Sequence, residues 1–95
     1  MDSDELHQRS NQNLKDFLRI EIELGLTFVS MARSYRARGN TTRFETSKQN
    51  ALAIVEAVER FNTRLPPHMR MEIESLCTKL TEAISILLGP AEKGE

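Results

Sequence analysis

The hydrophobic and polar positions of residues 19–28 alternate like those of a half-buried β-strand, with an apolar side chain at every second position from Ile20 to Phe28. Over the longer window 11–38, however, the apolar positions recur every three or four residues and gather within about 80° of Leu14 on a helical wheel. A strand would also need a partner for its backbone groups, and no other segment of the chain offers a convincing one. We therefore predict a helix over residues 11–38.

Glycine and proline residues divide the rest of the chain into two further helical segments. Gly39 suits the left-handed position after a helix C-terminus, and Thr42 with Glu45 forms a Thr-x-x-Glu capping box that predicts the start of the second helix. Pro67 suits the first turn of a third helix, where its missing N–H costs nothing. The predicted fold class is therefore all-α, a three-helix up-down-up bundle. Its helices span residues 11–38, 42–64 and 67–88, within one domain over 11–88 and between flexible tails at 1–10 and 89–95.

Two residues on the apolar face of the first helix are unusual there. Gly25 lies near the centre of the face, where glycine costs about 1 kcal/mol of helix propensity relative to alanine, so we expect a neighbouring helix to approach it closely. Glu21 lies on the same face, where a carboxylate should not be left unpaired. Asn62, a group of the third helix or water is its expected partner, whereas Lys48 would need an offset in the register of the hairpin. We interpret Glu21 as a structural carboxylate, because no other catalytic group accompanies it.

The first two helices each carry a short motif of large and small residues: Leu24, Gly25 and Phe28 in the first, and Ala51, Val55 and Val58 in the second. With these motifs, residues 18–65 resemble the helical hairpin of a tetratricopeptide protein, present here as a single copy. In both, a small residue on each helix lets the pair approach closely. The resemblance implies a protein-binding scaffold, and it carries over no ligand residue.

Charge and composition narrow the choice of partner and location. The 14 acidic and 13 basic residues nearly cancel, so the whole-molecule charge favours neither nucleic acid nor an anionic membrane. The single cysteine, Cys77, can form no intramolecular disulfide, and the first ten residues lack the pattern of a signal peptide. The apolar segments are shorter than the roughly 20 residues that span a bilayer. We expect a cytoplasmic protein without membrane insertion.

The sequence predicts no enzyme, cofactor or metal site. Cys77 lies within the apolar stripe of the third helix, which favours a small buried side chain over a reactive thiol. His68 and Glu72 lie four positions apart and share a helix face, but they lack the further ligands that a zinc or di-metal site needs. No phosphate-binding loop, paired Cys-x-x-Cys motif or Ser/His/Asp signature occurs.

Two surfaces are candidates for binding a partner. Arginines gather around the first turn, where cations are also favoured by the helix dipole, and a second apolar stripe follows the first helix outside its main face. An uncovered stripe predicts self-association, most simply an antiparallel homodimer through the first helices. The candidate residues are Ile20, Leu24 and Met31 in the stripe, and Arg33, Arg36, Arg38 and Arg43 in the turn.

The leading interpretation is a non-enzymatic protein–protein interaction module or small adaptor, whose protein partner the sequence does not name. The alternative is a small nucleic-acid-associated regulator that uses the arginine-rich turn. Four arginines with one aromatic residue, Tyr35, among them are a weak signal for nucleic acid, so we favour the protein partner.

Overall fold

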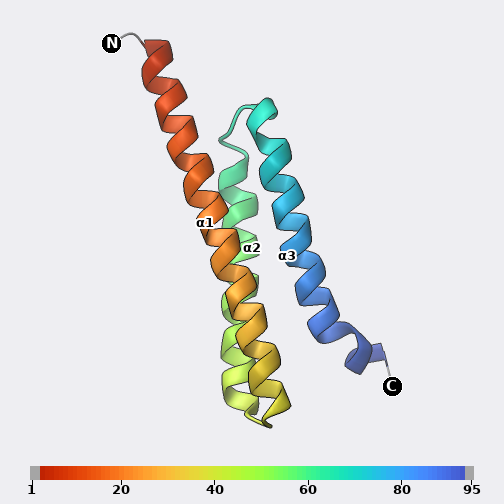
Figure 1. Cartoon of the computed structure of the whole chain (residues 1–95). Coiled ribbons are helices and arrows are strands. Elements are labelled where there is room, and N and C mark those ends of the chain that lie inside the picture. Colours follow the sequence, from red (N-terminus) through yellow and green to blue (C-terminus); the bar gives the residue numbers. More distant parts are fainter. Residues whose placement is uncertain (1–2, 94–95) are drawn as a thin grey trace.

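The computed structural model describes the backbone of residues 3–93 and the side chains of residues 5–88. It contains three helices, α1 (Ser3–Ala37), α2 (Thr41–Asn62) and α3 (Pro67–Lys93). Helix α2 runs antiparallel to α1, and α3 returns in the direction of α1 (Figure 1). The predicted all-α, three-helix up-down-up bundle is confirmed. The molecule is elongated, with principal extents of 57 × 22 × 15 Å, because the first helix is much longer than the hairpin partner it packs on.

The outer helices are longer than the sequence pattern predicted. Helix α1 begins at Ser3, so residues 3–10, which we expected to form a tail, are helical, and the start of α1 projects past the connection between α2 and α3 (Figure 1). Helix α3 continues through Pro90 to Lys93. A proline removes one helical hydrogen bond and bends a helix without always ending it, and α3 bends near its C-terminal end (Figure 1). The remaining tail positions, 1–2 and 94–95, lie outside the described residues.

Gly39 closes the first helix as predicted. Its backbone has a φ of 75°, in the left-handed region that glycine adopts without steric cost. The Gly39 amide donates to the carbonyl of Arg36, and the Asn40 amide donates to the carbonyl of Tyr35 at 2.9 Å. These two bonds are the pair that defines a Schellman motif, which satisfies carbonyls that the end of the helix leaves without partners.

The second helix is capped by a residue other than the predicted one. The side-chain oxygen of Asn40 accepts a hydrogen bond from the backbone amide of Arg43 at 3.1 Å, so Asn40 is the N-cap of α2. The predicted capping box of Thr42 and Glu45 is therefore wrong, and the Glu45 carboxylate instead pairs with Lys48 at 2.8 Å. The Schellman turn ends at residue 40, which makes Asn40 the first residue free to act as an N-cap.

This cap has a measurable consequence. We expect Asn40→Ala to reduce the free energy of unfolding by about 1 kcal/mol, because the Arg43 amide loses its acceptor. Thr42→Ala is the matched control and should cost less, since the Thr42 side chain does not cap the helix. Urea unfolding followed by circular dichroism measures both variants. A larger loss for Thr42→Ala than for Asn40→Ala would restore the capping box and contradict the observed turn.

The core lies along the line where the three helices meet. Each helix contributes one face of apolar side chains at three- and four-residue steps, as the periodicity predicted. The buried residues include Leu18, Ile22, Val29 and Ala32 of α1, Ala51, Ile54 and Val58 of α2, and Ile73, Cys77, Leu80, Ile84 and Leu87 of α3. Cys77 is thus a small buried side chain, as expected.

Gly25 marks the closest approach of α1 to its neighbours. A Cβ atom at this position would lie 2.7 Å from Leu80 Cδ2 in α3 and 3.3 Å from Ile54 Cγ2 in α2. Real Cβ atoms essentially never come as close as the first of these distances. The prediction that a neighbouring helix approaches Gly25 is therefore confirmed, and both other helices do so.

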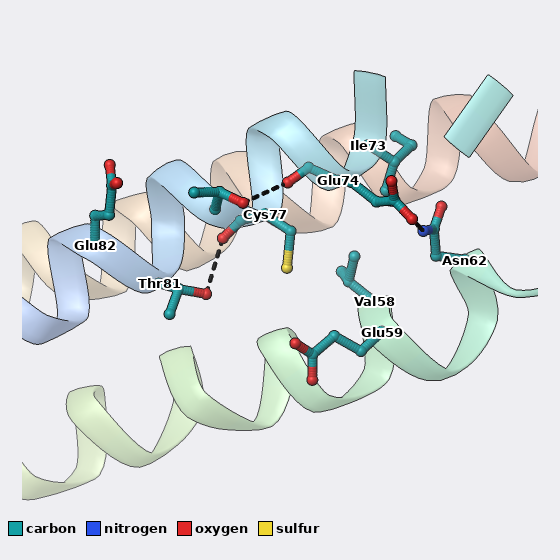
Figure 2. Close-up of a pocket in the computed structure, with 9 residues that line it drawn as sticks. Val58, Glu59, Asn62, Ile73, Glu74, Cys77, Thr81 and Glu82 are labelled. Carbon is teal, nitrogen blue, oxygen red and sulfur yellow. Dashed lines mark hydrogen bonds between the residues drawn. The ribbon is translucent and has the colours of Figure 1, made fainter. Parts of the chain in front are cut away.

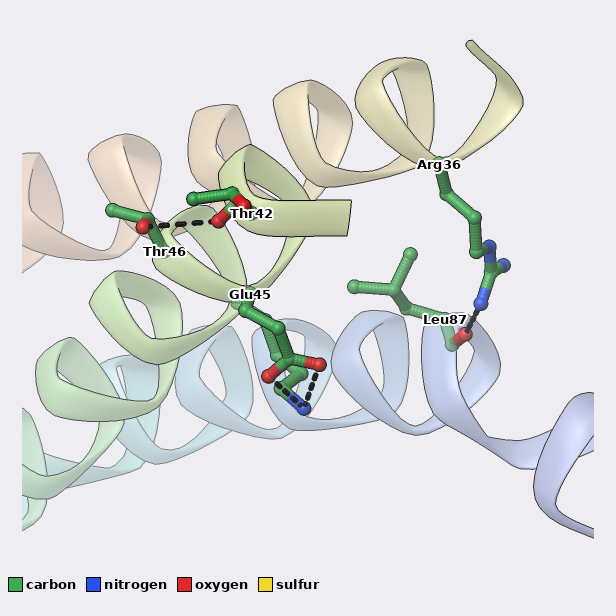
Figure 3. Close-up of polar contacts among 6 residues, drawn as sticks. Arg36, Thr42, Glu45, Thr46 and Leu87 are labelled. Atoms are coloured by element: carbon green, nitrogen blue, oxygen red, sulfur yellow. Dashed lines mark hydrogen bonds and ion pairs between the residues drawn. The ribbon is translucent and has the colours of Figure 1, made fainter. Parts of the chain in front are cut away.

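Polar contacts fix α3 against α1 at two places far apart along the bundle. Near its start, Glu72 of α3 pairs with Lys15 at 2.8 Å and with Arg19 at 3.4 Å. Near the other end, the guanidinium of Arg36 donates to the carbonyl of Leu87 (Figure 3). Each contact joins helices that no short loop connects, so together they help to set the register of α3 along α1.

Glu21 pairs with neither of the two protein partners that we considered for it, Asn62 and a group of the third helix. Its side chain is half-buried, and no hydrogen bond or ion pair joins it to another residue in the described part of the chain. Asn62 donates to Glu74 instead, and Lys48 pairs with Glu45. Of the partners considered for Glu21, water remains, because the helix face of Glu21 turns partly out of the core, where water can solvate the carboxylate.

Candidate interaction surfaces

An uncovered apolar stripe follows the outer side of α1. We call it the outer stripe, and it consists of four exposed side chains: Phe17 (51% exposed), Ile20 (62%), Leu24 (43%) and Met31 (38%). Three of them are the residues that the sequence pattern placed in a second stripe, and α3 does not cover them. Their steps of three, four and seven positions are those of the a and d positions of a coiled coil. The geometry thus presents a helix face suited to packing against another helix.

The arginine-rich turn is largely engaged within the protein itself. The Arg36 guanidinium lies 5.3 Å from the centre of the Phe44 ring, in addition to its bond to Leu87. Arg38 and Arg43 lie 5.4 Å and 5.7 Å from the centre of the Tyr35 ring. These distances are those of cation–π contacts, which stabilise a local structure.

Like Arg36, the other two of these arginines also make hydrogen bonds. Arg38 donates to the Ser34 hydroxyl at 2.8 Å, and Arg43 donates to the Tyr35 hydroxyl at 3.5 Å. Arg33 is exposed and has no such contact with any described residue. Three of the four arginines named from the sequence therefore stabilise the turn between α1 and α2. The sequence pattern alone did not indicate these contacts.

Glu72, which shares a helix face with His68, is paired with two cations of α1, Lys15 and Arg19. The hydrogen bond from Lys15 is the main cause that lowers the pKa of the Glu72 carboxyl below its ordinary value, and the charges of Lys15 and Arg19 add to it against the opposing effect of desolvation. His68 is exposed. Among the residues whose side chains are described, no group of three His, Cys, Asp or Glu lies close enough together to hold a metal ion.

A groove with an apolar floor lies between α2 and α3, and the sequence did not reveal it (Figure 2). It has a volume of about 330 Å³. The floor of the groove is formed by Val58, Ile73 and Cys77, and three glutamates line its sides. The remaining lining residues are Glu59, Asn62, Glu74, Thr78, Thr81 and Glu82.

The sequence held one usable signal for this groove. Glu59 and Glu74 each follow a buried residue of their helix, Val58 and Ile73, so each carboxylate starts at the margin of an apolar face. Burial is the main cause that raises the pKa of the Cys77 thiol, and the negative charge of Glu59 raises it further. The groove therefore has a negative potential and an unreactive thiol in its floor.

No family model, curated protein or solved structure matches the chain. Within the described residues, no helix combines the length and the apolar character needed to cross a membrane. The functional argument therefore starts from the two surfaces themselves, the outer stripe of α1 and the groove between α2 and α3.

Proposed function

We propose that this protein is a non-enzymatic protein–protein interaction module that self-associates through α1. The observation that carries the proposal is the outer stripe, whose four large apolar side chains are between 38% and 62% exposed. Contiguous apolar surface at helix spacing typically marks an interface, whereas scattered apolar residues do not. The α1 helix of a second copy carries the same stripe, so packing the two α1 helices together would bury both stripes.

An antiparallel arrangement suits the charges better than a parallel one. Arg33 and Arg36 lie in the last two turns of α1, Arg38 directly follows the helix, and Arg43 lies in the first turn of α2. Parallel helices would bring these clusters from both copies together, which like charges disfavour. In an antiparallel pair with Leu24 at the two-fold axis, Phe17 lies opposite the partner's Met31. A closed two-fold dimer is also the commonest form of homo-oligomer.

The hairpin of α1 and α2 supports a scaffold role in the manner of a tetratricopeptide hairpin. A Cβ atom at Gly25 would lie only 3.3 Å from Ile54 Cγ2, so the two helices lie close together there, and Ala51 of α2 is fully buried. Small residues at such positions let helices approach closely and leave their outer faces available for binding. We infer that the hairpin serves as a rigid support for the outer stripe.

The proposal includes a cytoplasmic location and a protein rather than a nucleic acid as partner. The lone thiol of Cys77 is buried, so the protein needs no oxidising compartment for its stability. The engagement of Arg36, Arg38 and Arg43 with nearby rings leaves few free cations for phosphate groups. The engagement of these arginines supports an adaptor over a nucleic-acid-associated regulator.

The oligomeric state of Leu24→Lys tests the proposal. We expect the wild-type protein to be a dimer by light scattering after size exclusion, and Leu24→Lys to be a monomer. Each dimer would lose two buried leucines, which weakens association by about 3 kcal/mol or more. Leu26→Lys is the matched control, since Leu26 is 38% exposed on the same helix but lies outside the outer stripe. It should remain a dimer.

Two outcomes would contradict this assignment. A wild-type monomer at high micromolar concentration would remove self-association, and a dimer that tolerates Leu24→Lys would move the interface away from α1. Salt-sensitive binding of RNA or DNA by the monomer would favour the arginine-rich turn as the functional surface instead.

A further inference from the structure

The groove between α2 and α3 combines an apolar floor with acidic walls. Its floor is formed by Val58, Ile73 and Cys77, which are all buried. Glu59, Glu74 and Glu82 line it, and among the described residues no lysine, arginine or histidine does. Neither Glu59 nor Glu82 has a hydrogen-bond or ion-pair partner in the described part of the chain. The groove is thus open to a ligand of positive charge.

The hydrogen-bond donors at the groove are already occupied. The Thr78 hydroxyl donates to the carbonyl of Glu74, and the Thr81 hydroxyl donates to the carbonyl of Cys77, both at 2.9 Å (Figure 2). The side-chain amide nitrogen of Asn62 donates to the Glu74 carboxylate at 3.5 Å. A ligand therefore meets acceptors rather than donors on these walls.

Asn62 adds an acceptor that the protein itself does not satisfy. Its side chain is 8% exposed, and its Oδ1 atom has no hydrogen-bond partner among the described residues. A buried acceptor without a partner is costly and rare in native proteins. Together with the carboxylates, it gives the groove a surplus of acceptors over an apolar floor.

We propose that this groove binds an arginine side chain, with an apolar neighbour, from a segment of a partner protein. A guanidinium carries five donors in a planar fork and can serve several acceptors at once. The methylene stem of an arginine packs on apolar surface while its charged end reaches acidic groups. This site uses α2 and α3, so it is independent of the outer stripe on α1 and of dimer formation.

A peptide titration tests the proposal on the full chain. The probe is an acetylated, amidated peptide of alternating arginine and leucine residues, and the control peptide carries neutral citrulline in place of arginine. Amide chemical shifts measured by NMR should change for the groove residues Val58, Cys77 and Thr81 on addition of the arginine peptide. The citrulline peptide should bind about tenfold more weakly, and raising the salt concentration should weaken only the arginine peptide.

Matched double variants separate the groove from a general charge effect. Glu59→Gln with Glu82→Gln removes two groove charges at exposed positions, and we expect the affinity for the arginine peptide to fall about tenfold. Glu23→Gln with Glu56→Gln removes the same charge elsewhere and should leave the affinity unchanged. Circular dichroism of both variants establishes that each is folded.

Three results would overturn the proposal. Equal binding of the two peptides would show that charge is not recognised, and equal loss in both double variants would show that the groove is not the site. Shifts of groove residues with protein concentration alone, in the absence of peptide, would place a second copy of this chain in the groove instead.

Discussion

Replacing Gly25 by valine is expected to lower the free energy of unfolding by about 3 kcal/mol, because the new side chain has no room between the three helices. Its Cβ alone would lie 2.7 Å from Leu80 Cδ2 and 3.3 Å from Ile54 Cγ2, before the two methyl groups are added. Leu80 is fully buried, so it cannot turn out of the way into solvent. Urea unfolding at matched protein concentration measures the effect.

Gly25→Ala provides the graded comparison. Alanine adds only the Cβ, and it gains about 1 kcal/mol of helix propensity over glycine, which opposes the steric cost. We therefore expect Gly25→Ala to lose clearly less stability than Gly25→Val. Valine at wild-type stability would mean that α1 and α3 do not approach as closely as the structure indicates.

The fold could be predicted largely because three long segments carry a helical period. Residues 19–28 show why a long window is needed, since their local alternation favours a strand while the surrounding positions favour a helix. Gly39 could be predicted because a left-handed residue after a helix has few alternatives to glycine. Gly25 could be predicted because a glycine on an apolar face needs a close neighbour to explain it.

The helix ends were less predictable because several residues compete for each role. Thr42 and Glu45 fit a capping box, but the turn that Gly39 closes leaves Asn40 in the N-cap position, two residues earlier than that motif needs. Residues 3–10 are polar apart from Leu6 and carry no apolar periodicity, although they are compatible with a helix. Pro90 was expected to follow the end of α3, whereas the helix bends and continues.

The two candidate surfaces differ in how far sequence reasoning could reach them. The outer stripe lies on a single helix, so its spacing in α1 is sufficient to identify Ile20, Leu24 and Met31. The groove depends on how α2 and α3 lie against each other, and its carboxylates, such as Glu59 and Glu74, come from different helices. The residue pattern of a single helix does not reveal how α2 and α3 lie against each other.

Leu80→Ala is expected to destabilise the protein by about 2 to 5 kcal/mol, as for other fully buried leucines. Leu80 has no exposed surface and lies in α3 directly against Gly25, so its loss opens a cavity at the meeting point of the helices. Ile86→Ala is the control on the same helix. Ile86 is 64% exposed, and its replacement should change the stability by no more than about 0.5 kcal/mol.

Combining Gly25→Val with Leu80→Ala tests whether these two residues set the distance between α1 and α3. The cavity left by Leu80 lies where the valine side chain needs space, because Leu80 Cδ2 and Cδ1 are two of the three atoms nearest to a Cβ at Gly25. The double variant should therefore lose about 1 to 2 kcal/mol less stability than the sum of the single variants. The four unfolding curves of this cycle give that coupling directly. Strictly additive losses would mean that the two side chains do not compete for the same space, and that α1 is held away from α3 by other residues.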